Sequence, residues 1–165
     1  MRLLHVIAIL VLIAGDASAQ SRATTPTVDG VWQIADDAGN PNGWFKIYQR
    51  NGAYEGQIVK VFFAPGQEAA TLLCSACLGP QKDAPALGLT FMIGMRRDGN
   101  VYENGRILNP LDGHLYRARM ELSDDGSSLA VQVYLASDRL GARRTWHRVP
   151  DSLETRQLMA MPIMD

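Results

Sequence analysis

Apolar and polar residues alternate along two neighbouring segments in the second half of the chain. The apolar positions are Tyr116, Ala118, Met120 and Leu122 in one segment, and Leu129, Val131, Val133 and Leu135 in the next. Side chains two residues apart point to the same face of a β-strand. Both segments are therefore predicted to be strands that turn one face toward a core.

Similar apolar segments, separated by turn residues, fill the rest of the chain from Gly30 onward. Asn51-Gly52 and Asp98-Gly99 are strong hairpin signals, because Asn, Asp and Gly tolerate positive φ. Short strands at even spacing are typical of an antiparallel meander. The eight predicted strands are 31–35, 44–50, 54–63, 87–97, 101–108, 114–123, 128–137 and 142–149.

An open meander of this kind would leave two exposed edges, and closure into a barrel removes them. The predicted fold class is all-β, a single antiparallel up-and-down β-barrel of about eight strands over residues 30–150, with a two-sheet sandwich as the alternative. Asn104-Gly105 interrupts one strand pattern, and a glycine there predicts a bulge or a bend. Residues 151–165 are expected to form a mobile tail or a short helix on the barrel.

Residues 1–19 have the pattern of a signal peptide. A basic residue precedes an apolar run over residues 3–14, which is shorter than the roughly 20 residues that span a bilayer. Ala17-Ser18-Ala19 fits a cleavage site before Gln20, with a linker over residues 20–29. We expect a periplasmic or secreted protein with no transmembrane segment after cleavage. A membrane anchor or a buried apolar helix is the alternative.

Charge and motifs narrow the classes of function. The formal net charge is −1, the pI is about 6.3 and the arginines are scattered, so no nucleic-acid partner is expected. Serine-hydrolase, zinc-protease and phosphate-loop motifs do not occur, and turn chemistry explains many of the carboxylates. His114 and His147 have no acid–base partner by spacing. We expect no catalytic residue, no metal and no cofactor.

Cys74 and Cys77 are the only cysteines, and two residues separate them. This spacing occurs in redox enzymes, zinc sites, haem attachment sites and plain disulfides. A redox motif needs the start of a helix, a structural zinc ion needs four ligands, and haem attachment needs histidine where Leu78 stands. In an exported chain the pair favours a disulfide that holds the long connection over residues 64–86.

Gly30-Val31-Trp32 opens the first predicted strand, and Trp146-His147-Arg148 closes the last. This arrangement resembles the lipocalin-like (calycin) barrels, in which a Gly-x-Trp of the first strand packs near an arginine of the final strand. The resemblance implies a barrel-closing motif of Gly30, Trp32, Trp146 and Arg148. It also implies that Arg148 lies beside the Trp32 indole.

From about Gly30 to Arg148 the chain also resembles the bacterial exported family called domain of unknown function 2147. Matching positions are Pro85, Leu89, Gly105, Ile107, Asn109, Pro110, Gly113, Tyr116, Trp146 and Arg148. Family members often have Asp at the position of Asn109 and an Arg-Gly-Tyr-like step at Gln132-Val133-Tyr134. The loss of both charges argues against catalysis at these positions, and the family implies no established activity.

Aromatic and methionine side chains are the candidates for lining a ligand cavity, with a packed core as the alternative. These candidates are Phe91, Met95, Tyr102, Tyr116 and Tyr134. The leading hypothesis is a non-enzymatic binder of a small apolar or amphipathic ligand. The alternative is a structural module of the cell envelope that has no cavity and binds an envelope protein.

Export gives the first testable prediction. Because the cleavage pattern ends at Ala19, N-terminal sequencing of the exported protein is expected to begin at Gln20. A protein that retains Met1 in a membrane fraction would contradict the prediction.

Overall fold

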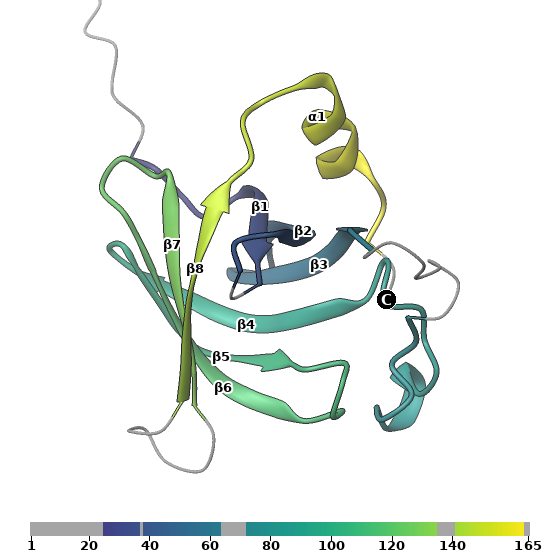
Figure 1. Cartoon of the computed structure of the whole chain (residues 1–165). Helices are drawn as coiled ribbons and strands as arrows, with labels where there is room; N and C mark the ends of the chain where they lie inside the picture. The colour runs from purple at the N-terminus through teal and green to yellow at the C-terminus, as the bar shows by residue number, and fades with distance from the viewer. Residues whose placement is uncertain (1–24, 37, 64–71, 135–140, 164–165) are drawn as a thin grey trace, which may run out of the picture.

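The chain folds into a closed eight-stranded antiparallel barrel with an α-helix packed outside it (Figure 1). The computed structural model describes residues 25–36, 38–63, 72–134 and 141–163. Its strands are β1 (Gly30–Ala35), β2 (Pro41–Arg50), β3 (Ala53–Val61), β4 (Thr90–Asp98), β5 (Val101–Leu108), β6 (Leu115–Leu122), β7 (Ser128–Tyr134) and β8 (Gly141–Arg148). The predicted fold class and strand order are therefore confirmed.

The start of β4 differs from the pattern for a local reason. The pattern predicts a strand from residue 87, but β4 begins at Thr90. Residues 86–89 form a turn instead, in which Gly88 has a φ of 89° and the Leu89 N–H donates to the Ala86 carbonyl at 3.1 Å. β7 is described to Tyr134, so the remainder of the predicted strand, including Leu135, lies outside the described residues.

Each strand pairs with its neighbour in sequence, and β1 closes the circle against β8. In the described residues this closing seam consists of the pairs Trp32–Arg148 and Gln33–His147. The seam between β7 and β8 is much longer and runs from Ser128–His147 to Tyr134–Gly141. Closure therefore depends on a short contact between the middle of β1 and the end of β8.

Turn residues determine the register of the hairpins. Asn51 and Gly52 both have positive φ (51° and 77°) in the β2–β3 turn, as a two-residue hairpin requires. The predicted irregularity in β5 is also present. Asn104 has a φ of 65°, and the pairing of β5 with β6 shifts between Tyr102 and Gly105.

The interior is most tightly filled near the start of β1, at what we call the closed end of the barrel. There Trp32, Met95, Tyr102, Met120 and Leu129 are all completely buried. At the opposite end, the open end, inward-facing apolar residues are only half-buried, namely Ile34, Phe45, Val61 and Val133. The closed end of the barrel, which we also call its floor, is therefore fully packed. The half of the interior toward the open end, which we call the upper half, is only partly buried.

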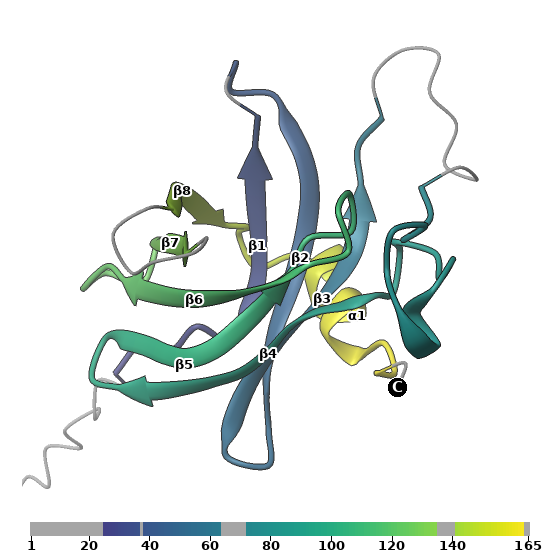
Figure 2. The same cartoon turned by 90° about the horizontal axis from the view of Figure 1, so that it is seen from below.

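The C-terminal segment forms a helix, α1 (Leu153–Ala160), which lies outside the barrel and contacts β1 (Figures 1 and 2). Ser152 and Thr155 cap its first turn reciprocally. Lys60 of β3 forms an ion pair with Glu154 at 2.8 Å. The buried Lys46 ammonium donates to the Met161 carbonyl at 2.6 Å, which ties the end of the helix to β2. No helix among the described residues is long and apolar enough to cross a membrane.

Candidate functional site

The closed end is organised by the guanidinium of Arg148, the last residue of β8. Its three nitrogens each donate to a backbone carbonyl at 2.6 Å, those of Gly126, Asp29 and Thr27. These acceptors belong to the β6–β7 turn and to the segment before β1. One side chain therefore fastens three parts of the chain that are distant in sequence. Burial lowers the pKa of Arg148, and the nearby Asp29 charge opposes that shift.

Arg148 also stacks on Trp32, as the resemblance to lipocalin-like barrels implies. The guanidinium carbon lies 4.3 Å from the indole ring, within the range of a cation–π contact. Gly30 makes room for this arrangement, because a Cβ at its position would lie 2.6 Å from Arg148 Nη1. Its φ of 138° is also one that residues with a side chain rarely adopt.

Residues 25–29 fall within the predicted linker, but they pack against the closed end instead. Val28 is completely buried, its carbonyl accepts from Trp32 Nε1 at 2.8 Å, and its N–H donates to the Tyr102 hydroxyl at 3.3 Å. Arg97 donates to the Pro26 carbonyl at 3.0 Å. The buried Val28 side chain and the hydrogen bonds of this backbone thus make residues 25–29 cover the closed end. We call this segment the N-terminal plug.

The upper half of the interior contains a cluster of three aromatic rings, from Phe45, Phe91 and Trp146. Phe45 lies 4.7 Å from Phe91 and 5.2 Å from Trp146, between ring centroids. Phe91 and Trp146 are 6.0 Å apart. These distances are typical of favourable tilted aromatic contacts. The cluster joins β2, β4 and β8 across the barrel.

Trp146 carries the one unusual polar group of this cluster. Its side chain is almost fully buried, with 4% exposed, and its indole N–H has no hydrogen-bond partner in the described structure. The Trp44 indole, on the outer wall, donates to Gln33 at 3.0 Å. A buried donor without an acceptor costs about 1–3 kcal/mol. Nothing in the sequence indicates this feature, because it depends on what surrounds the ring.

The candidate lining residues are distributed between three places. Met95 and Tyr102 belong to the filled floor, and Phe91 belongs to the aromatic cluster. Tyr116 is half-buried at the open end, where its hydroxyl donates to Asp112 at 2.8 Å. Tyr134 corrects the expectation, because it lies on the outer wall opposite Arg117.

The reason for the position of Tyr134 is the two-residue period of β7. Val133 pairs with the buried Ala118 and takes the inward position. Its neighbour must therefore face outward. The alternating pattern of β7 contained this information, and it outweighs the aromatic character of the residue.

Asp112 organises the β5–β6 turn at the open end. Its carboxylate accepts from the His114 N–H at 2.9 Å, and from Tyr116 and the Asn109 amide at 2.8 Å each. Partial burial alone would raise the pKa of Asp112, but these hydrogen bonds outweigh it and lower the pKa. The carboxylate thus stabilises the turn, in agreement with the turn chemistry that its sequence position indicates.

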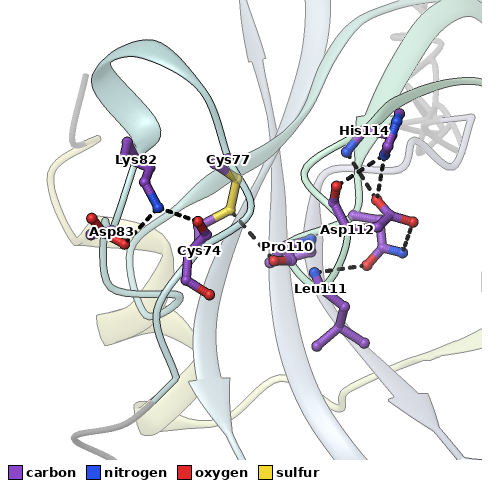
Figure 3. The surroundings of a disulfide bond; sticks show 10 residues. Cys74, Cys77, Lys82, Asp83, Pro110, Leu111, Asp112 and His114 are labelled. Carbon is purple, nitrogen blue, oxygen red and sulfur yellow. Dashed lines mark hydrogen bonds and ion pairs between the residues drawn. A yellow bond between two sulfur atoms is a disulfide. The ribbon is translucent and has the colours of Figure 1, made fainter.

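Cys74 and Cys77 form a disulfide within the connection between β3 and β4 (Figure 3). Their Cα atoms are 5.3 Å apart and both residues are buried. The Cys77 N–H donates to the Cys74 carbonyl at 3.0 Å, which closes a tight turn. The Cys74 sulfur lies 3.7 Å from the Pro110 carbonyl, so the bridge packs against the β5–β6 turn. The predicted disulfide is confirmed.

The surroundings of the bridge differ from those of a redox centre. The cysteines lie in a turn, and the short 3-10 helix that follows, η2 (Gly79–Gln81), contains neither of them. In the described part of the chain, no group of three or more His, Cys, Asp and Glu side chains could hold a metal ion. Enclosure of both sulfur atoms is consistent with a structural bridge.

The disulfide segment also exposes several large apolar side chains. Leu78 is the most exposed of them, at 84%. The others on this segment and the adjoining part of β4 are Leu72, Leu73, Leu87 and Ile93. A cleft of about 530 Å³ lies between this segment and the β2–β3 hairpin, with Arg50 and Glu55 on its far side. Large exposed apolar side chains that lie near one another make this segment a candidate contact surface.

The role of Arg148 yields a prediction about stability. Replacement by lysine keeps the charge but cannot supply three directed donors, so buried carbonyls lose their partners. Arg148→Lys is expected to lower the free energy of unfolding by about 2–4 kcal/mol in urea denaturation. Arg143→Lys, on the exposed part of β8, is the matched control and should change it by less than about 0.5 kcal/mol. Equal effects from both variants would contradict the prediction.

The disulfide yields a second prediction. Because the bridge closes a short loop within one connection, its loss removes about 2 kcal/mol and leaves the barrel folded. Cys74→Ser/Cys77→Ser is expected to melt several degrees below the wild type, with the same far-ultraviolet circular dichroism. The wild type should show no insulin-reducing activity. Rapid insulin reduction, or zinc held by both thiolates, would show instead that the pair is a chemical site.

Comparison with known proteins agrees with this architecture. A solved structure described as "Protein HP1028 from the human pathogen Helicobacter pylori belongs to the lipocalin family" aligns over 81% of this chain and 90% of its own, with a TM-score of 0.66 and 20% identity. At that identity the similarity shows the fold alone.

No curated protein matches the chain. The family described as "Uncharacterized protein conserved in bacteria (DUF2147)" matches residues 30–148. The chain therefore belongs to the DUF2147 family, with a lipocalin-like barrel as its fold.

Proposed function

We propose that this protein is an exported, non-enzymatic binder of a small apolar or amphipathic molecule. The observation that carries the proposal is the buried indole N–H of Trp146, which has no hydrogen-bond partner among the described residues and lies in an otherwise apolar aromatic cluster. Native structures rarely leave such a donor unsatisfied. A ligand acceptor that reaches this N–H would remove its cost.

The surroundings of Trp146 define the chemistry of the ligand. The rings of Phe45 and Phe91 offer flat apolar surfaces, and Ile34, Val61 and Val133 continue this surface toward the open end. The ligand therefore has an apolar, preferably planar body and one hydrogen-bond acceptor such as a carbonyl oxygen. Because the indole nitrogen is enclosed, binding requires a neighbouring ring to move. Phe45 is less buried than Phe91.

Two features support the exported location in this proposal. The leader pattern over residues 1–19, which lies outside the described residues, ends in a cleavage motif. The Cys74–Cys77 disulfide is of a kind that persists in oxidising compartments such as the periplasm. We infer a carrier or sensor of a small molecule outside the cytoplasm.

The exposed leucines of the disulfide segment favour a second candidate function, an envelope module that binds another protein. Leu73 and Leu87 line a further cleft of about 400 Å³ with Val59 and Phe63. In this second proposal the rigid barrel only presents the apolar surface, and the interior binds nothing. Ligand binding that depends on Trp146 separates the two proposals.

Trp146→Phe tests the first proposal, because it removes the N–H but keeps an aromatic ring. Two fluorescent probes report on it: prodan, which has a ketone acceptor, and N-phenyl-1-naphthylamine, which has none of comparable strength. The variant is expected to bind prodan about five- to tenfold more weakly, since one hydrogen bond is lost. Its affinity for N-phenyl-1-naphthylamine should change by less than about twofold.

Trp44→Phe is the matched control, since that indole already has an acceptor on the outer wall. It should leave the binding of both probes unchanged. If neither probe binds to the wild type, the first proposal is overturned. Binding that is abolished by Leu73→Gln/Leu87→Gln, and unaffected by Trp146→Phe, would favour the exposed apolar surface instead.

A further inference from the structure

The seam between β1 and β8 ends early, so that part of one edge of β8 lies beyond it. Among the described residues, β1 pairs with β8 at Trp32 and Gln33. In the same register Ala35 would lie opposite Thr145, but these two residues do not pair. β1 follows β2 instead, with a register shift between Ile34 and Ala35. In Figure 1 the two strands approach each other near the end of β8.

The part of β8 beyond the seam is exposed along its whole length. Residues 141–145 are all exposed, although each of them pairs with a residue of β7. Ala142 belongs to the inward-facing set of β8, because it lies opposite the half-buried Val133. The exposure of an inward-facing residue indicates that the barrel wall is open beside this part of β8.

The hydrogen bonds at the end of β8 determine which backbone groups point into the opening. The Arg148 N–H donates to a carbonyl of the β6–β7 turn at 2.9 Å, and the Val149 N–H donates to the Val31 carbonyl at 2.8 Å. Successive residues of a strand direct their N–H and C=O groups to opposite sides. Those of Thr145 and Arg143 therefore point toward the β1 side, where the described residues provide no partner for them.

Charge distinguishes between the strands that could pair with this edge. Arg143 is exposed, and no carboxylate among the described residues forms an ion pair with it, whereas the adjacent Arg144 has contacts of its own. Two antiparallel copies of β8 would each bring an Arg143 to the junction, and like charges that meet across strands are destabilising. Charged edge residues of this kind oppose self-association. A strand with an acidic side chain opposite Arg143 would instead be stabilised.

We propose that the free edge of β8 binds an extended segment of another protein that has an acidic residue opposite Arg143. The added strand forms main-chain hydrogen bonds with Thr145 and Arg143, as in other cases of strand addition. Its side chains alternate between the two faces of the wall. Acidic residues lie on the outer face beside Arg143, and apolar residues lie toward Ala142 and the half-buried Ile34. The inference concerns the backbone of β8 and does not depend on a ligand near Trp146.

Hydrogen exchange of the free mature protein tests whether the edge is open. The amides of Thr145 and Arg143 are expected to exchange at least about tenfold faster than those of Arg144 and Trp146, which point toward β7. Equal protection of all four amides in dilute protein would show that the edge is already paired, and would overturn the proposal.

A synthetic peptide of seven alternating valine and glutamate residues serves as the probe, and its binding is followed by fluorescence anisotropy. Saturable binding is expected, together with slower exchange of the Thr145 and Arg143 amides. Thr145→Pro removes the N–H on the free side and leaves the hydrogen bonds to β7 in place. It should weaken binding about tenfold or more. Thr145→Val keeps the N–H and is the matched control, with a change of less than about twofold.

The acidic character of the partner is tested with a second peptide, in which lysine replaces glutamate. Arg143→Glu should weaken binding of the glutamate peptide about threefold or more and strengthen binding of the lysine peptide. Arg156→Glu is the control of equal charge, since Arg156 lies on α1 and pairs with Asp151. It should change neither affinity by more than about twofold.

Four results would contradict the proposal. The glutamate peptide may fail to bind to the wild type, or Thr145→Pro and Thr145→Val may weaken its binding equally, which would exclude the backbone edge. Equal effects of Arg143→Glu and Arg156→Glu would show only a general charge effect. A dimer in sedimentation analysis that protects the Thr145 amide, and that Thr145→Pro abolishes, would identify a second copy of the chain as the occupant.

Discussion

The packing of Arg148 against Trp32 is the contact on which the closed barrel depends. The direct seam between β1 and β8 is short, and the buried guanidinium reinforces it through three backbone carbonyls and one indole face. A buried charge is costly without partners, so the carbonyl of Gly126 and those of the N-terminal segment must remain in place around it. Closure, the N-terminal plug and the β6–β7 turn are therefore one cooperative unit.

This unit makes the two ends of the barrel physically different. At the closed end, hydrogen bonds and completely buried side chains leave little space for rearrangement. Toward the open end, half-buried apolar residues surround the aromatic cluster. Within the cluster, the Trp146 N–H has no acceptor among the described residues. The interior of an eight-stranded barrel is just wide enough to be filled by side chains or to hold one small ligand. The disulfide holds the connection that borders this half.

The alternation that fills the interior also determines the outer wall. In β6, inward-facing residues alternate with outward-facing residues, and the outward-facing residues include Arg117 and Arg119. The bulge in β5 then gathers these arginines with Arg106 around one cleft. Interior and outer wall thus carry opposite chemistry, apolar and cationic, on the same strands.

Much of this architecture follows from local pattern. The two-residue period and the Asn-Gly and Asp-Gly turns indicated eight antiparallel strands, and the resemblance to lipocalin-like barrels implied the Trp32–Arg148 contact. The same period determined the outward position of Tyr134. Only the tertiary structure decided that residues 25–29 pack against the end of the barrel, that Trp146 lacks an acceptor among the described residues and that three arginines line one cleft. Those properties depend on which groups from distant strands meet, and local sequence carries no information about the absence of a partner.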